Sequence, residues 1–187
     1  MIIDFQAHVF PAVYLAEMKR LDGVVVLEAP DPHSGMSYFY DKKLACRINT
    51  CTLQGQDIDR RLQHMDQHGV DIHVLTIPAP GADRFEGEGA IQIARIANDA
   101  IAAIARQHPK RFIGFFTLPT CNITASLDEL ERSVNELGLR GFGGFANLNS
   151  QALDREELFP IYERLAQYKL PVYIHPTAPL ATESSGI

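Results

Sequence analysis

Two histidines near opposite ends of the sequence each end a short apolar run. His8 ends IIDFQAH and His175 ends VYIH. A metal-ligand side chain at the end of a strand-like run is typical of parallel α/β proteins, whose strands deliver side chains to a common rim. Their separation of 167 positions (175 minus 8) is too long for one local loop and suits four strand-helix units. We therefore predict that both histidines bind one divalent metal ion, with a buried structural histidine as the alternative for each.

Gln6 is a weaker ligand candidate beside the first histidine. In a strand of period two, Asp4, Gln6 and His8 share one face. The Gln6 amide oxygen brings no charge to a metal ion, so it is a poorer donor than an imidazole or a carboxylate. A plain hydrogen-bonding role is its alternative. Asp4 either orients a neighbouring ligand or makes a structural hydrogen bond.

Apolar, strand-like runs alternate with amphipathic helical ones along most of the chain. Most of these runs are continuously apolar, as expected for parallel strands covered on both faces. The predicted strands are 2–5, 71–78, 112–119, 141–148 and 171–176. The predicted helices are 57–68, 88–107, 126–137 and 155–168, and Ser126 with Glu129 forms a capping box at the start of the third. Such repeats predict a parallel sheet with right-handed crossovers.

One segment departs from this alternation. From Gly23 to Gln56 the sequence is β-prone and rich in turn residues, without a helical period. We interpret it as an insertion of short strands beside the site, within a single domain of residues 1–187. A (β/α)8 barrel usually needs about 250 residues. The fold class that we predict is therefore α/β, as an incomplete (β/α)8 TIM barrel with about five of the eight units.

The composition excludes several classes of partner. The chain is 46% hydrophobic and 21% charged, with a net charge of −6, and carries no basic stripe for nucleic acid. Neither an apolar run of about 20 residues nor a secretory signal pattern is present, so we expect a cytoplasmic protein without membrane contacts. The three cysteines, Cys46, Cys51 and Cys121, lack CxxC spacing and are expected to be reduced. A small molecule remains as the partner.

Several motifs together resemble a known family. The runs IIDFQAHVFP, MDQHGVDIHVLTIP, FIGFFTLP, GLRGFGGFANLN and LPVYIHPT occur in an order and spacing similar to the amidohydrolase-2 group of the amidohydrolase superfamily, of the aminocarboxymuconate-semialdehyde decarboxylase type. The resemblance implies a TIM barrel that holds a divalent metal, Zn or Mn. His8 and His175 match ligand positions, and Gln6 stands where the family has His or Glu. The Asp that completes the family's site is expected beyond Ile187.

The resemblance also implies an activity. It is that of a metal-dependent carboxy-lyase acting on a small unsaturated or aromatic carboxylic acid, with a metal-dependent hydrolase as the close alternative. An inactive, truncated remnant or pseudoenzyme is the alternative of a different class, because the expected catalytic acid is missing. Arg47, in the segment that the family folds over the site, is the candidate for holding the substrate carboxylate, against an ordinary surface arginine. An incomplete barrel exposes unpaired strand edges, so we expect a homo-oligomer.

Overall fold

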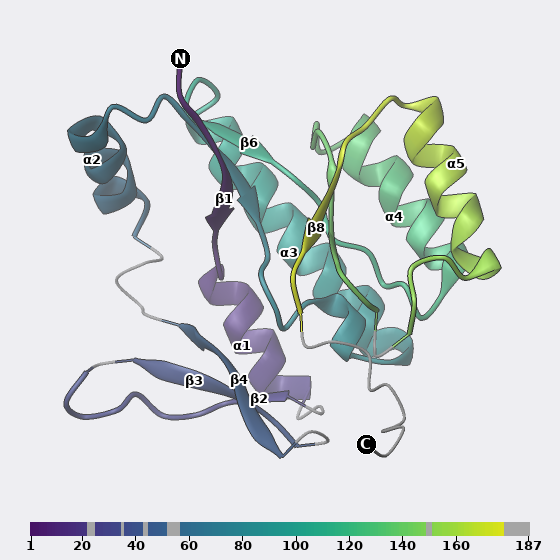
Figure 1. Ribbon diagram of the computed structural model, residues 1–187, viewed down its shortest axis with the longest axis horizontal. Helices are drawn as coiled ribbons and strands as arrows, with labels where there is room; N and C mark the ends of the chain where they lie inside the picture. The colour runs from purple at the N-terminus through teal and green to yellow at the C-terminus, as the bar shows by residue number, and fades with distance from the viewer. Residues whose placement is uncertain (22–24, 35, 43–44, 52–56, 149–150, 178–187) are drawn as a thin grey trace, which may run out of the picture.

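The protein has a layered α/β fold in which parallel strands are separated by helices. The computed structural model describes residues 1–21, 25–34, 36–42, 45–51, 57–148 and 151–177 (Figure 1). The parallel strands are β1 Ile3–His8, β5 Ile72–Thr76, β6 Phe112–Gly114, β7 Phe142–Phe145 and β8 Val172–His175. The helices of the alternating units are α2 Ile58–His68, α3 Gly87–Gln107, α4 Ile123–Asn135 and α5 Phe159–Gln167. All five predicted strands are thus present in the predicted order, and the first extends to His8.

The parallel strands lie side by side in the order β1, β5, β6, β7, β8. Backbone hydrogen bonds join β1, β5 and β6 in one group and β7 with β8 in another. A parallel bridge between Phe116 and Phe142 links the groups, since the Phe116 N–H donates to the Gly141 carbonyl and the Gly143 N–H to the Phe116 carbonyl, both at 2.8 Å. Their carboxyl ends therefore meet at one edge of the molecule. The predicted α/β class with parallel strands is confirmed.

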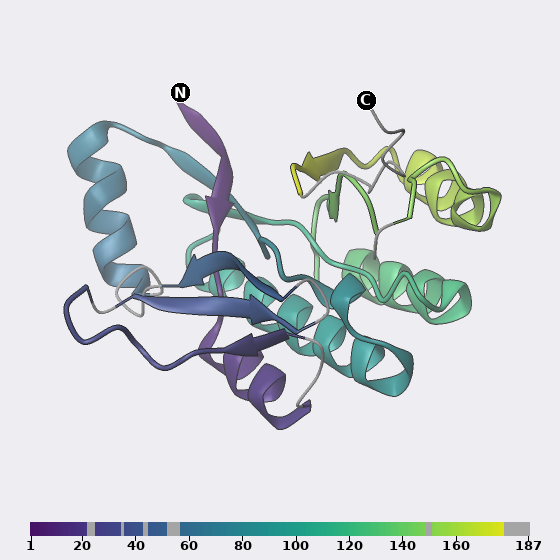
Figure 2. The same cartoon turned by 60° about the horizontal axis from the view of Figure 1, so that its bottom comes forward.

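Helices α3 and α4 cover one face of these strands (Figures 1 and 2). Helix α3 turns Ile93, Ala97 and Ile101, all 0% exposed, into the core. This spacing of three to four residues is the apolar stripe by which a helix packs on a sheet. No helix in the described part of the chain is long and apolar enough to cross a membrane.

The helices differ from the predictions at three places. An additional helix, α1 Ala12–Leu21, follows β1 and buries Tyr14, Leu15 and Met18. Pro11 directly before it is a helix-start signal that the prediction missed. Helix α4 begins earlier than predicted, because Asn122 caps it by accepting a hydrogen bond from the Ala125 N–H at 3.0 Å. The last predicted helix is split into a 3-10 turn, Glu156–Leu158, and α5.

The predicted capping box at Ser126 and Glu129 is wrong. Both residues lie inside α4 and are buried. The Ser126 hydroxyl donates to the Pro119 carbonyl at 2.9 Å, and Glu129 turns toward α3. The sequence pattern of a capping box is a Ser or Thr followed three residues later by Glu or Gln. Two buried polar residues inside a helix can have the same spacing, so the pattern led to the wrong prediction.

The predicted insertion forms a separate antiparallel sheet. Its strands are β2 Val25–Leu27, β3 Ser37–Asp41 and β4 Cys46–Cys51, in the order β2-β3-β4. Residues 23–24, 35, 43–44 and 52–56 of the predicted insertion lie outside the described residues. The Asn49 side chain donates to the Ala79 carbonyl at 2.5 Å, and Arg84 forms an ion pair with the buried Asp41. These contacts hold the sheet against the loop that follows β5.

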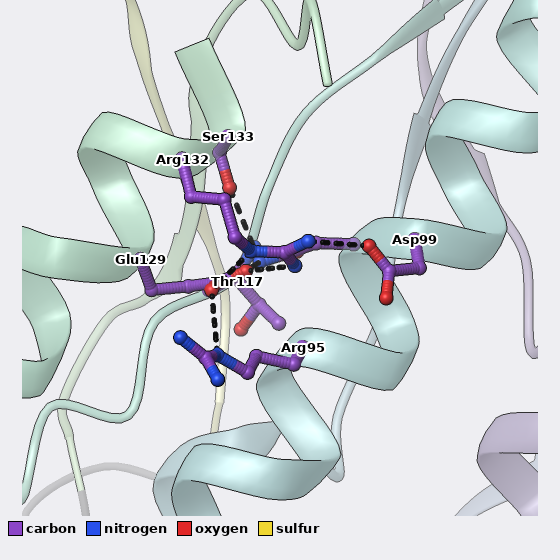
Figure 3. A network of polar contacts seen from close by, with 7 residues as sticks. Arg95, Asp99, Thr117, Glu129, Arg132 and Ser133 are labelled. Carbon is purple, nitrogen blue, oxygen red and sulfur yellow. Dashed lines mark hydrogen bonds and ion pairs between the residues drawn. The ribbon is translucent and has the colours of Figure 1, made fainter. Parts of the chain in front are cut away.

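A buried polar network joins α3, α4 and the chain after β6 (Figure 3). The Asn98 side chain accepts a hydrogen bond from the Thr117 N–H at 2.8 Å and donates to the Thr117 carbonyl at 3.0 Å. It also donates to Glu129, 1% exposed, at 2.7 Å. Arg132 binds Glu129 and Asp99, and these carboxylates raise the pKa of its guanidinium. The network satisfies groups that would be costly to bury unpaired.

Removing the buried carboxylate is expected to destabilise the fold. Glu129→Ala leaves the Arg132 guanidinium and the Asn98 amide short of an acceptor, so we expect the free energy of unfolding to fall by about 3 kcal/mol. Urea denaturation followed by circular dichroism measures this. Asp128→Ala, at the neighbouring position of the same helix, is the control and should change it by less than about 0.5 kcal/mol. Equal effects of the two substitutions would contradict a stabilising role for the network.

Candidate functional site

His8 and His175 meet at the carboxyl ends of β1 and β8. Their Nε2 atoms lie 3.1 Å apart, and their ring centroids 4.8 Å apart. Both side chains are partly buried. The Ala146 N–H donates to the His175 carbonyl at 2.8 Å, so the end of β7 also holds the second histidine. The structure thus brings together the two residues that sequence spacing singled out.

Each imidazole has a hydrogen-bonding partner at its Nδ1 atom. The Nδ1 of His175 lies 2.6 Å from the Pro176 carbonyl, which can only accept, so this nitrogen carries the proton. The Nε2 of His175 therefore keeps its lone pair. The Nδ1 of His8 lies 3.0 Å from the hydroxyl of Thr76. A hydroxyl donates or accepts, so this contact suits a His8 ring that carries its proton on Nδ1.

The surroundings of His8 favour its neutral form. Burial lowers its pKa from 6.5 to about 4, and the neighbouring His175 contributes to this decrease, against a smaller opposite effect of Asp4. A neutral imidazole is the form that binds metal ions. The site is therefore set up for ligation by His8 at neutral pH.

A bulge in β1 separates Asp4 from His8. Asp4 pairs with His73 of β5 and His8 with Thr76, so four steps along β1 match three along β5. Because His73 and Thr76 are an odd number of residues apart, Asp4 and His8 point to opposite faces. The prediction of a shared face is therefore wrong. Asp4 lies 3.7 Å from His73, while Gln6 lies within the bulge with an exposed side chain.

Helix α2 contributes a partly buried cation, Arg61, next to the first histidine. The Arg61 Nη2 donates to the His8 carbonyl at 2.7 Å, and its Nη1 lies 3.5 Å from His73 Nδ1. Burial lowers the pKa of Arg61 and also that of His73. The contact anchors the end of β1 through its backbone and leaves the His8 ring to face His175.

The two histidines fit a shared metal ion, but they are only part of a ligand set. Nitrogen ligands lie about 2.0–2.1 Å from zinc, so two nitrogens 3.1 Å apart can both reach one ion. Imidazole suits zinc and other transition metals. Among the described residues, no group of three or more His, Cys, Asp or Glu side chains is arranged to hold a metal. A third ligand would therefore be another type of residue, such as Gln6, or a residue outside the described part of the chain.

The other candidates from the sequence have their own contacts or are exposed. The Arg47 guanidinium donates to Glu28 at 2.7 Å and stacks 4.2 Å from the Tyr38 ring centroid, both within the insertion. The His64 and His68 side chains, four residues apart on α2, are exposed. Cys121 is a free thiol, as predicted, and the side chains of Cys46 and Cys51 lie outside the described residues.

Two residues at the site were missed by sequence reasoning. Thr76 is a polar residue that ends the apolar run IHVLT, so the rule that singled out His8 and His175 also points to it. Arg61 follows another arginine on an amphipathic helix, and no sequence signal distinguishes it from a surface residue.

Comparisons with known proteins find a matching family model and several similar proteins. A family model described as Amidohydrolase matches residues 3–185. The chain is similar to 2-amino-3-carboxymuconate-6-semialdehyde decarboxylase of Dictyostelium discoideum, with 39% identity over 121 residues, 64% of this chain and 34% of the relative. It is also similar to gamma-resorcylate decarboxylase of Rhizobium sp. strain MTP-10005, with 35% identity over 137 residues, 67% of this chain and 41% of the relative. The chain thus spans well under half the length of these relatives.

A solved structure shares the fold. The 5-carboxyvanillate decarboxylase of Novosphingobium aromaticivorans, with bound manganese and 3-methoxy-4-hydroxy-5-nitrobenzoic acid, superposes with a TM-score of 0.62 at 32% identity. The match covers 64% of this chain and 35% of that chain.

The lowered pKa of His8 predicts a stability that depends on pH. Between pH 6.5 and about 4 the unfolded chain binds a proton at His8 that the folded chain does not, so the free energy of unfolding should fall as the pH decreases through this window. His73, whose pKa is also lowered, adds to the fall. His8→Gln should therefore reduce the slope without abolishing it. Urea denaturation in a metal chelator at pH 7, 6 and 5 measures this.

The control for this slope is His64→Gln, which changes an exposed histidine on α2 and should leave the slope as it is. Carboxylates with lowered pKa, such as Glu131, lose their contribution only below about pH 4.5, outside the measured range. Equal slopes for the unsubstituted protein and for His8→Gln would contradict the prediction.

Proposed function

Because the chain belongs to the amidohydrolase family, we propose that its parallel strands β1, β5, β6, β7 and β8 are five adjacent strands of a (β/α)8 barrel. Support comes from their order, since β1, β5, β6, β7 and β8 are neighbours in the order in which they occur along the chain. A helix lies between each consecutive pair in the sequence. The convergence of the first and fifth strand ends on one point also supports it, since ligands meet at the carboxyl rim of such barrels.

The proposed function is that of a metal-dependent, non-oxidative decarboxylase acting on a small aromatic or unsaturated carboxylic acid. The observation that carries it is the 3.1 Å approach of two imidazole Nε2 atoms from residues 167 positions apart. The names of the relatives, which include two decarboxylases of carboxylic acids, support the reaction type. The manganese in the 5-carboxyvanillate decarboxylase supports a divalent metal, with zinc as the other candidate.

The roles of the residues follow from their chemistry. His8 and His175 would hold the ion through Nε2, and Gln6, two residues before His8, is the candidate for a third, neutral donor. When bound, a divalent ion supplies a positive charge that polarises a substrate oxygen. Decarboxylation replaces the carboxyl group by a proton, which a nearby acid must donate. No described Asp or Glu forms a three-residue group with the histidine pair.

Arg47 is the proposed anchor for a substrate carboxylate. Its planar guanidinium can bind a carboxylate with two parallel hydrogen bonds. The side chain is exposed, and its Nε is paired with Glu28. A substrate carboxylate must therefore displace Glu28 from the Nε of Arg47, or bind the two Nη atoms of the guanidinium.

Metal retention and carbon dioxide release together test the proposal. Two imidazoles fall short of the usual three protein ligands, so we expect the purified protein to hold zinc or manganese weakly. His8→Ala and His175→Ala should each abolish binding, while Gln6→Glu should strengthen it because it adds a charged donor. Mass spectrometry of dialysed protein counts the metal. With 2,6-dihydroxybenzoate we expect little carbon dioxide from this chain, and more from a longer form that supplies an acid.

Each outcome of this experiment selects one function. One tightly held metal ion that survives both alanine substitutions would refute the site. Hydrolysis of esters or lactones without carbon dioxide release would select the hydrolase. Metal binding without either activity, in the longer form as well, would indicate an inactive member of the family. His64→Ala, at an exposed helix position, is the control and should leave metal retention unchanged.

The outer strands of the proposed partial barrel are expected to drive association. Ile3 and Phe5 of β1 are 37% and 51% exposed, and Val172 and Ile174 of β8 are 43% and 52% exposed. Apolar outer strands pair with other chains unless they are covered. We therefore expect the protein to be a homo-oligomer or larger aggregate, and Val172→Thr with Ile174→Thr to reduce its mass in light scattering. Val13→Thr, at a 57% exposed position on α1, is the control. A monodisperse monomer would contradict the prediction.

A further inference from the structure

Thr76 occupies a special place beside the histidine pair. It ends β5, is 1% exposed, and lies directly opposite His8 in the strand register. We propose that Thr76 is the positioning residue that holds the His8 imidazole with its Nε2 lone pair toward the metal site. The proposal rests on the proposed function, because it concerns the ligand role of His8.

The hydroxyl of Thr76 is held at a defined point. Its Oγ1 lies 3.0 Å from His8 Nδ1, and its own backbone carbonyl accepts the Val9 N–H at 3.0 Å. Thr76 therefore contacts two successive residues at the end of β1, His8 through its hydroxyl and Val9 through its carbonyl. A shift of β1 against β5 would break both contacts, so the hydroxyl and the imidazole keep their relative position.

The methyl group and the hydroxyl of Thr76 lie toward different strands. The Cβ and Cγ2 atoms of Thr76 face Gly143 of β7, where a built Cβ would lie 3.6 Å from each. The methyl group thus lies on the β7 side, while the hydroxyl points to β1. Because a β-branched residue has few favourable χ1 rotamers, the hydroxyl of Thr76 has few alternative directions.

The hydrogen bond decides which nitrogen of His8 is available. When Thr76 Oγ1 accepts the Nδ1 proton, the lone pair of His8 resides on Nε2, which faces Nε2 of His175 at 3.1 Å. His175 has the same arrangement, since its Nδ1 donates to the Pro176 carbonyl. Both imidazoles are thus oriented through Nδ1 and present Nε2, as metal-binding histidines with an oriented second nitrogen do.

The test compares the loss of the hydroxyl with its retention. Thr76→Val keeps the shape of the side chain and removes the acceptor, so we expect zinc affinity, measured by direct calorimetric titration, to fall about 10- to 100-fold. Thr76→Ser keeps the hydroxyl and should bind zinc nearly as well as the unsubstituted protein. The control is Thr117→Val, at a 5% exposed threonine whose backbone, not its side chain, binds Asn98; it should leave zinc affinity unchanged.

A second readout reports on His8 directly. In the zinc-loaded, unsubstituted protein, the imidazole nitrogen shifts of His8 in long-range proton-nitrogen spectra should show a protonated Nδ1 and a metal-bound Nε2. This measurement needs no variant, so it decides the question even where Thr76→Val does not fold. Zinc bound through Nδ1 of His8 would overturn the proposal.

The failure of this proposal and that of the metal site are distinguishable. Unchanged zinc affinity in Thr76→Val, with binding still lost in His8→Ala, overturns the positioning role and leaves the metal site intact. Zinc binding that does not respond to His8→Ala overturns both. Weak binding in Thr76→Val together with normal binding in Thr76→Ser supports the proposal.

Discussion

Parallel hydrogen bonding between the strands is the constraint on which the rest of this structure depends. A parallel pair cannot be joined by a tight turn, so a helix must return the chain to the starting edge after each of β5, β6 and β7. Every strand then ends at the same edge. His8 and His175, at opposite ends of the sequence, approach to 3.1 Å for this reason and without any local contact between their segments.

The polar groups of the helix layer and of the strand ends are matched with partners. On the helix side, Asn98 binds both backbone groups of Thr117 and the buried Glu129, which in turn holds Arg132. At the strand ends, the two histidines are satisfied by a hydroxyl and a carbonyl. An unpaired polar group in either place would cost free energy. The same requirement thus shapes a structural network in one layer and a pair of oriented imidazoles in the other.

One extra residue in β1 divides the charged groups near the site between two faces. The bulge sends Asp4 to the face that carries His73, while His8 turns to Thr76 and His175. Arg61 of α2 then binds the backbone of His8, which fixes the strand end and leaves the ring free to act as a ligand. A regular strand would have placed the Asp4 carboxylate on the ligand face, where it would favour a charged His8. The bulge therefore contributes to the neutral form of this histidine.

The sequence by itself determined the alternation of strands and helices, the α/β class, the family, and the choice of His8 and His175. The alternation, the class and the two histidines follow from local periodicity and from the residue type at the end of each apolar run. The family follows from the resemblance of several motifs in their order and spacing. It missed α1 and misplaced the start of α4, where a buried polar pair imitated a cap. Only the tertiary structure decided that Thr76, 68 positions away, touches His8, and that Asp4 turns away from it. Such contacts depend on strand register and on a single bulge, because one added residue reverses the face of every side chain on one side of it, and no local pattern in the sequence records that shift.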